Sequence, residues 1–259
     1  MTASEPPASV PARQERRFHL TAAPREPQPG PERDPGPPAD PWRITLTYHH
    51  EHLWYSDADA SPETWNVSAD IWDDSGTYAE SHVGDISIVV IDPYETGDPV
   101  GLLDGESGDL GLVAETIFIP GRRGLDPDLE EQLEPNGSQI LILDSVRLAP
   151  PWRGFGLGPL LAGAVIKKLS GGVQAAACYP APLNDEADSG EYTQVTGEAE
   201  TEALAAHERG IAALAGVWGK LGFEHFRSGV YVLDLNLTTL DDRLAELREH
   251  LGRYAGRED

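Results

Sequence analysis

The sequence predicts an α/β (α+β) protein in which helices flank a mixed β-sheet and a disordered N-terminal tail precedes the domain. Residues 140–143 are apolar on both alternating faces, and Val146 and Leu148 follow, which is typical of a central strand covered on both sides. A glycine-rich turn and an apolar helical run follow. Residues 173–178 then form a second short apolar run, which predicts a neighbouring parallel strand. Residues 1–41, by contrast, contain half of the 22 prolines and almost no bulky apolar side chains.

The tail, residues 1–41, cannot bury enough apolar surface to offset the entropy lost on ordering, so we expect it to be disordered. One folded domain is expected over residues 42–259. Its first strand is predicted from the alternation of Ile44, Leu46 and Tyr48 with polar residues. Residues 65–72 and 85–92 predict two further strands that pair antiparallel. His50 and His52 lack a third ligand at a recognisable spacing, which favours strand surface over a metal site.

Two helices are predicted between these strands and the central strand. Ser107 is a plausible N-cap for a helix that begins near Asp109, and residues 126–133 predict a short acidic helix. After the central strand, the helical run ends near Ser170, where Gly171 and Gly172 stop it.

The C-terminal part is predicted to contain an acidic insertion, a long helix, two strands and a final helix. The insertion covers residues 183–202, the long helix residues 203–221, the last strands residue 226 and residues 229–235, and the final helix residues 238–254. Four leucines of the final helix form one stripe, which predicts packing onto its own domain, with a homodimer contact as the alternative. They are Leu240, Leu244, Leu247 and Leu251.

The net charge is −25, and the tail is nearly neutral, so the folded part carries the excess. Such a surface repels nucleic acid and anionic lipid and favours a cationic partner, or it simply keeps the chain in solution. A single cysteine, Cys178, rules out an intrachain disulfide and fits a reducing compartment. There is no apolar run of membrane-spanning length and no secretory signal, so we expect a cytoplasmic protein without a membrane partner.

The turn after the central strand, Arg153-Gly154-Phe155-Gly156-Leu157-Gly158, is suited to binding an anion. Strand, glycine turn and helix aim free backbone N–H groups and a positive helix end at a negative group. A dinucleotide fingerprint would need glycine where Pro159 stands, and the G-K-[ST] of a Walker loop is absent. The spacing R-x-x-G-x-G instead resembles the pyrophosphate loop of the GNAT superfamily of acyl-CoA-dependent N-acetyltransferases.

A second motif lies downstream and supports this resemblance. Residues 217–224, VWGKLGFE, resemble the family's helix-end segment L-Y-x-K-L-G-F-x. The resemblance covers residues 138–235, whereas the N-terminal half departs from the family because three strands precede the helices. It implies a GNAT-like sheet that splays near Leu148 to admit acetyl-CoA.

The resemblance also implies roles for individual residues. The loop from Arg153 to Gly158 would bind the pyrophosphate, and the main chain around Leu148 and Ala149 would stabilise the oxyanion. Asp144 interrupts an apolar strand on the face expected for Ile142 and Val146, and either serves as a base or is paired for structure alone.

Trp218 occupies the position where the family often has an acidic tyrosine, and it either contacts the cofactor or belongs to the core. An indole cannot donate the proton, so Tyr179 or water would replace that acid.

The resemblance thus implies transfer of an acetyl group from acetyl-CoA to a small-molecule or protein amine, and no metal is expected. The alternative is a non-catalytic module of the same fold that senses acyl-CoA or binds a protein. The acidic insertion, residues 183–202, would select a cationic acceptor, or is a solvated surface loop.

Overall fold

The structure is a computed structural model that describes residues 36–52, 54, 61–71, 82–182 and 198–255. Residues 1–35, which make up most of the tail predicted to be disordered, lie outside the described residues. The described fold begins with a short turn of 3-10 helix, η1 (Pro41–Arg43), which Asp40 caps by accepting a hydrogen bond from the N–H of Trp42. Residues 183–197 of the acidic insertion also lie outside.

One mixed sheet carries the fold, and seven strands belong to it within the described residues. Its order is β1-β2-β3-β4-β5-β7-β6, parallel between β4 and β5 and antiparallel elsewhere. The strands are β1 (Ile44–His50), β2 (Glu63–Ile71), β3 (His82–Ile91), β4 (Gln139–Leu148), β5 (Val173–Cys178), β6 (Glu224–Arg227) and β7 (Val230–Asp234). The mixed sheet and its parallel central pair are therefore as predicted.

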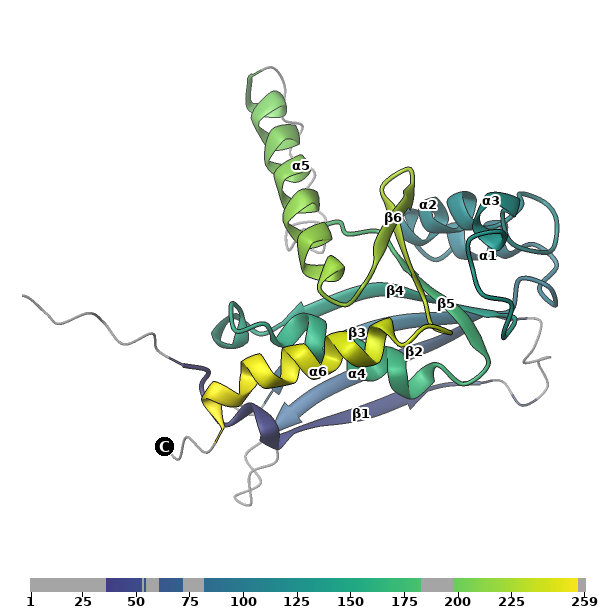
Figure 1. Ribbon diagram of the computed structural model, residues 1–259. Helices are drawn as coiled ribbons and strands as arrows, with labels where there is room; N and C mark the ends of the chain where they lie inside the picture. The colour runs from purple at the N-terminus through teal and green to yellow at the C-terminus, as the bar shows by residue number, and fades with distance from the viewer. Residues whose placement is uncertain (1–35, 53, 55–60, 72–81, 183–197, 256–259) are drawn as a thin grey trace, which may run out of the picture. The chain divides into compact units, whose positions relative to one another are not determined.

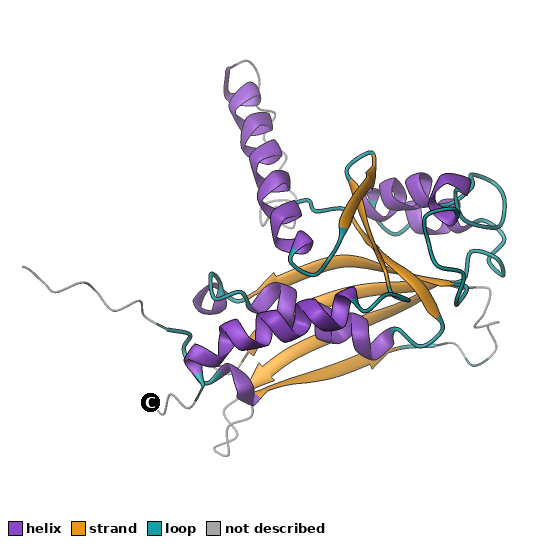
Figure 2. Cartoon of the chain, viewed as in Figure 1, coloured by secondary structure: helices purple, strands orange, loops and turns teal. Residues whose placement is uncertain are grey.

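Helices lie between several of these strands along the chain and after the last one (Figure 2). Between β3 and β4 lie α1 (Pro99–Asp104), α2 (Gly108–Ile117) and α3 (Pro127–Glu130). The turn η3 (Pro150–Trp152) and α4 (Leu157–Leu169) follow β4, and α5 (Glu198–Gly219) precedes β6. The chain then ends in α6 (Thr239–Leu251) and η5 (Gly252–Tyr254). Within the described part, no helix is long and apolar enough to cross a membrane.

One helix was not predicted, and another begins earlier than predicted. The helix α1 was not predicted, although Asp98 accepts a hydrogen bond from the N–H of Gly101 and Pro99 opens the helix, a regular N-terminal signal. The helix α5 begins at Glu198, five residues before the predicted start at 203. Residues 198–202 therefore belong to a helix rather than to a loop, which corrects the predicted extent of the insertion. As predicted, Ser107 caps α2 by accepting from the N–H of Leu110.

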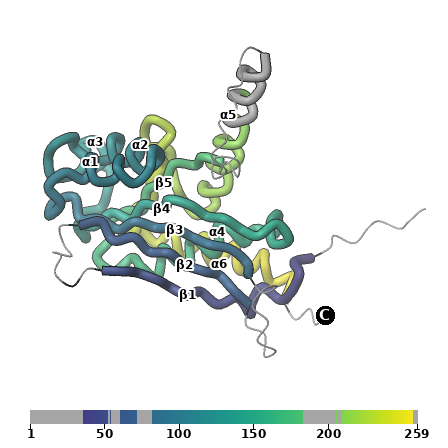
Figure 3. The backbone as a smooth tube through the Cα atoms, turned by 180° about the vertical axis from the view of Figure 1, so that it is seen from behind, coloured from purple at the N-terminus to yellow at the C-terminus, as the bar shows by residue number. Residues whose placement is uncertain are grey.

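The sheet separates two hydrophobic cores. Helices α4 and α6 cover one face, where Val165, Ile166 and Leu244 pack against strand residues such as Leu141. Helices α1 to α3 cover part of the other face, where Leu103 and Ile117 pack with Ile140 and Ile142. Figure 1 shows α4 and α6 in front of β1 to β4, and Figure 3, seen from behind, shows the strands in front of them. We call these two sides the α4/α6 face and the α1–α3 face.

The stripe predicted on the final helix packs onto its own domain. Leu240, Leu244 and Leu251 are buried, and Lys167 of α4 forms an ion pair with Asp241 of α6. A homodimer through this stripe stays a prediction, but the leucines that suggested it already contact α4 and the sheet.

A β-bulge interrupts the central strand at Asp144. Ser87 of β3 lies opposite Ser145, but Ile88 lies opposite Leu143, so Asp144 has no partner in β3. One extra residue reverses the alternation of faces along the strand. Leu143 and Val146 consequently contact the same core, on the α4/α6 face, while Ile142 faces the other side. The prediction that Asp144 shares a face with both Ile142 and Val146 is therefore wrong.

Strands β4 and β5 diverge immediately beyond the bulge. Their parallel pairing runs from Gln139 and Val173 to Leu143 and Cys178, where β5 ends. Strand β4 continues to Leu148, and within the described residues no strand pairs with its last five residues on the β5 side. The gap opens between the two central strands of the sheet.

Candidate functional site

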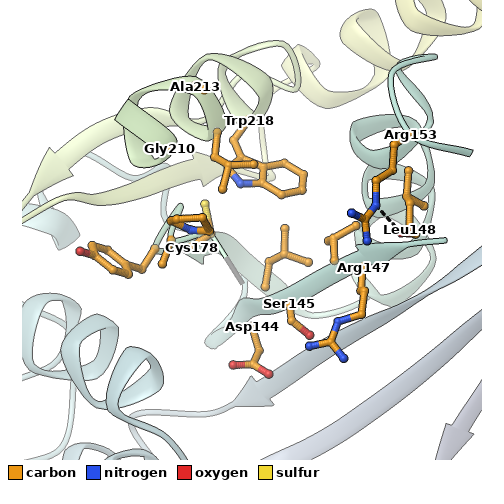
Figure 4. A pocket seen from close by; sticks show the side chains of 15 residues that line it. Asp144, Ser145, Arg147, Leu148, Arg153, Cys178, Gly210, Ala213 and Trp218 are labelled. Carbon is orange, nitrogen blue, oxygen red and sulfur yellow. Dashed lines mark hydrogen bonds between the residues drawn. The ribbon is translucent and has the colours of Figure 1, made fainter. Parts of the chain in front are cut away.

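A cavity of about 390 Å³ occupies the gap between β4 and β5 (Figure 4). Its floor is β4 from Leu143 to Leu148, and Arg153 lies beside it. The end of β5 contributes Cys178 and Tyr179, and α5 contributes Gly210, Ala213, Leu214 and Trp218. The cavity thus brings together the strand, the loop and the helix end that the sequence analysis singled out. We call it the donor cavity.

The hydrogen bonds of β4 decide which backbone groups face this cavity. The N–H of Ala149 donates to the carbonyl of Val83 at 2.9 Å, which makes these two residues a hydrogen-bonded pair. Because antiparallel pairs alternate, the groups of Arg147 also face β3, whereas those of Val146 and Leu148 face the gap. The side chain of Arg153 agrees with this assignment, since its Nε donates to the carbonyl of Leu148 at 2.8 Å.

The main-chain N–H expected to stabilise the oxyanion is therefore that of Leu148 or Val146. Ala149 was also predicted for this role, but its N–H is bonded to the carbonyl of Val83, which favours Leu148 of the two predicted positions.

The glycine loop adds further backbone donors at one end of the cavity. Gly154 and Gly156 have φ angles of +87° and +79°, and in both cases a Cβ would meet no atom within 4 Å. Gly156 is the N-cap of α4 and offers no side-chain cap, so the first N–H groups of the helix are left without an intrahelical partner.

The loop's two apolar side chains fix it to the domain. Leu157 is buried, and the ring of Phe155 packs edge-on against that of Tyr254 with their centroids 5.7 Å apart. Gly158 lies close to the floor, since a Cβ there would be 3.9 Å from Leu148 Cδ1.

The charges around the donor cavity favour an anion at its mouth. Arg147 and Arg153 both line it and account for two of the chain's 19 lysines and arginines. Within the described residues, neither forms an ion pair. Asp144 is the only carboxylate in the part of the lining that the structure describes. On a chain with a net charge of −25, this is a locally basic site. Arg147 was not predicted as a site residue, because the direction of the side chains beyond Asp144 depends on a register shift against β3 that the sequence does not show.

Asp144 projects from the bulge toward the α1–α3 face, away from Trp218 and Arg153 (Figure 4). Burial raises the pKa of its carboxyl, a hydrogen bond with Ser87 opposes that shift, and the negative charge of Asp109 adds to it. Asp144 also lines a second cavity, of about 260 Å³, between α1, α2 and strands β2 and β3. An acidic side chain with a raised pKa at the junction of two cavities has the character of a proton-transfer group.

Tyr179 and Cys178 lie at the end of β5 and face opposite sides of the sheet. Tyr179 packs against the core of the α1–α3 face, and its ring lies so near Gly229 that a Cβ there would be 3.0 Å from it. Cys178 belongs to the other core, and burial strongly raises the pKa of its thiol, which keeps it protonated. Asp144 and Tyr179, the two predicted catalytic residues, are therefore on the same side of the sheet and both border the donor cavity.

Trp218 belongs to the core and also forms part of the cavity wall. Its side chain is 7% exposed and its ring packs edge-on against Phe223, with the centroids 6.5 Å apart. Trp218 therefore belongs to the core, and its contact with the cofactor stays a prediction. Among the described residues, no group of three or more His, Cys, Asp or Glu side chains is arranged to hold a metal ion.

No protein-family model, no curated protein and no solved structure matches the chain.

Proposed function

We propose that the chain transfers an acetyl group from acetyl-CoA to a primary amine. The observation that carries the proposal is the gap between β4 and β5, which has free strand backbone along one wall and the arginine–glycine loop at one end. Arg153 and Trp218, one from each motif that resembles the acyltransferase superfamily, line the cavity in this gap although they are 65 residues apart in sequence. The placement of α1 to α3 after the third strand remains a departure from that family's usual order.

The residues present fit acetyl-CoA. The open space around Gly154 and Gly156 and the free N–H groups at the start of α4 suit a pyrophosphate, and Arg153 supplies a cation. A pantetheine arm has amide groups that can pair with the exposed edge of β4 at Val146 and Leu148, as an added strand would. When bound, the thioester supplies an activated acetyl group.

The proposed chemistry requires two contributions from the chain. The N–H of Leu148 or Val146 would stabilise negative charge that develops on the thioester oxygen. Asp144, directly or through water, would take a proton from the acceptor ammonium, since only a neutral amine attacks. Tyr179 or water would return a proton to the departing sulfur.

One experiment tests both binding and turnover. Calorimetry of the full chain with CoA is expected to show one site per chain, and acetyl-CoA with a panel of primary amines is expected to release free thiol at a rate that requires the amine. If CoA does not bind, the proposal is wrong. Heat of binding without amine-dependent thiol release would instead establish the alternative described next.

The alternative is a non-catalytic acyl-CoA-binding module, and one observation favours it. At the position where the resembling family often has an acidic tyrosine, this chain has Trp218, which is buried and packed against Phe223. Such a side chain supports the cavity wall but donates no proton at the pH of the cell.

A further inference from the structure

The cavity on the α1–α3 face has no role in the binding of acetyl-CoA described above. It lies between β2, β3 and the α1–α2 segment, and its lining shares one residue with the donor cavity, Asp144. The bulge causes this, because the extra residue turns the carboxyl toward the α1–α3 face while its backbone stays at the edge of the gap. A molecule in the second cavity would therefore meet one in the donor cavity at Asp144.

We propose that this second cavity binds the acceptor, and that the acceptor is a small cationic primary amine on a short apolar stem. This inference rests on the proposed function. It specifies the class of acceptor and the face of the sheet from which the acceptor enters.

The charge of the cavity carries the first part of the inference. Among the described residues, its lining contains two carboxylates, Asp144 and Glu106, and no lysine, arginine or histidine. Asp109, in the first turn of α2, lies near enough to interact electrostatically with Asp144. An ammonium group entering here is attracted, whereas a carboxylate or phosphate is repelled. The two cavities thus differ in sign, because the donor cavity has two arginines.

The size and the walls carry the second part. Leu103, Leu110 and Val89 form a buried apolar wall, and Leu102, 46% exposed, lies at the rim. Thr64 and Ser87 add hydroxyl groups from the strands. A volume of about 260 Å³ with these walls accommodates a short aliphatic or aromatic stem rather than a large polyhydroxylated acceptor.

The transfer balances without any further reactant. The ammonium loses one proton to Asp144, the amine nitrogen forms a bond to the carbonyl carbon, and the carbon–sulfur bond breaks. The sulfur leaves with the bonding electron pair and takes up a proton, while the nitrogen loses its second proton as the amide forms.

The test uses benzylamine as the cationic probe, benzyl alcohol as its neutral analogue and β-alanine as an amine with a carboxylate. Amide NMR of the full chain, without CoA, is expected to show saturable benzylamine shifts at Thr64, Ser87 and residues 102–110, and much weaker effects of the other two. Glu106→Gln is expected to weaken benzylamine binding about 3-fold to 10-fold at low salt. The matched control is Glu115→Gln, an exposed acid on α2 outside the cavity, which is expected to change nothing.

The outcome separates this inference from the proposed function. CoA affinity, measured in parallel, is expected to stay within about two-fold in both variants, because Glu106 does not line the donor cavity. Benzylamine shifts that are absent or that lie elsewhere, or equal affinities of Glu106→Gln and Glu115→Gln, would overturn the acceptor site while leaving the CoA site intact. A chain that binds benzylamine in this cavity but not CoA would contradict the proposed function and support the cation site alone.

Discussion

Replacing Gly156 with glutamate is expected to abolish most of the affinity for CoA while leaving the domain folded. The residue has a φ of +79° at the N-cap of α4, and a Cβ built there meets no atom within 4 Å. The new side chain therefore causes no clash. It introduces the strain of a left-handed conformation and a carboxylate beside the free N–H groups of the helix.

The two costs can be separated by size. A non-glycine residue in the left-handed region costs about 1–2 kcal/mol of folding stability, and each kcal/mol lowers the Tm of a chain of this size by roughly 2–4 °C. A carboxylate about 6 Å from a phosphate charge costs about 0.7 kcal/mol in water and about 2.8 kcal/mol at the effective dielectric of a protein surface. The expected loss of CoA affinity is thus about 3-fold to 100-fold, and it shrinks as salt is added.

Gly121 provides a matched control. It is exposed, has a φ of +66°, and also leaves open space around a Cβ, but it lies between α2 and α3 and does not line the donor cavity. Gly121→Glu is expected to lose similar stability in thermal melts and no CoA affinity in calorimetry. If the two variants bound CoA equally well, the assignment of the pyrophosphate to this loop would be refuted.

Two further predictions concern stability. Because burial raises the pKa of Asp144, the folded state holds its proton more tightly than the unfolded state, and wild type loses stability as pH rises through that raised pKa. The Tm of Asp144→Asn relative to that of wild type is therefore expected to rise between pH 4 and pH 8. A Tm difference that stays constant across that range would contradict this. Gly163→Ala would place a Cβ 2.8 Å from side-chain carbons of both Leu221 and Leu244. This overpacking is expected to lower the free energy of unfolding by about 1–3 kcal/mol, measured by chemical unfolding, and to leave CoA affinity unchanged. An unchanged free energy of unfolding would mean that α6 shifts freely on α4.

The segment from β4 through the glycine loop to α4 was predictable, because the sequence patterns that identify it are local. The apolar run of β4, the glycines of the loop and the apolar face of α4 lie within some thirty residues, so periodicity and turn chemistry identify them. Arg153 of the loop and Trp218 of the helix-end segment line one cavity, while their roles toward acetyl-CoA stay predictions. The N-cap Ser107 and the leucine stripe of α6 were predicted from the same kind of local pattern.

The bulge at Asp144 was not predictable, because an inserted strand residue is visible only against the register of its partner β3. This single feature changes the face of Val146, opens the second cavity to Asp144 and leaves the backbone of Leu148 at the gap. The choice between Leu148 and Ala149 was open for the same reason, since only the pairing with Val83 shows which N–H groups are used. The missed helix α1 had a signal, Asp98 before Pro99, but it lies in a segment too short to show periodicity.

The missing tyrosine need not prevent catalysis, because the two proton transfers differ in their free-energy cost. An amine with a pKa near 10.4 must lose a proton at pH 7, which costs about 4.6 kcal/mol, whereas expelling a thiolate whose thiol has a pKa near 8.5 costs only about 2 kcal/mol. An acid at position 218 can therefore recover at most about 30-fold in rate, while a base at Asp144 is worth about 10²-fold to 10⁴-fold. Trp218→Tyr, compared with Trp218→Phe to control for the lost volume, is expected to raise kcat by less than about 30-fold, and Asp144→Asn to lower it by at least about 100-fold. If Trp218→Tyr created turnover where wild type has none, the native chain would be a binding module that lost its acid. If Asp144→Asn kept full kcat, the base would have to be sought elsewhere in the two cavities.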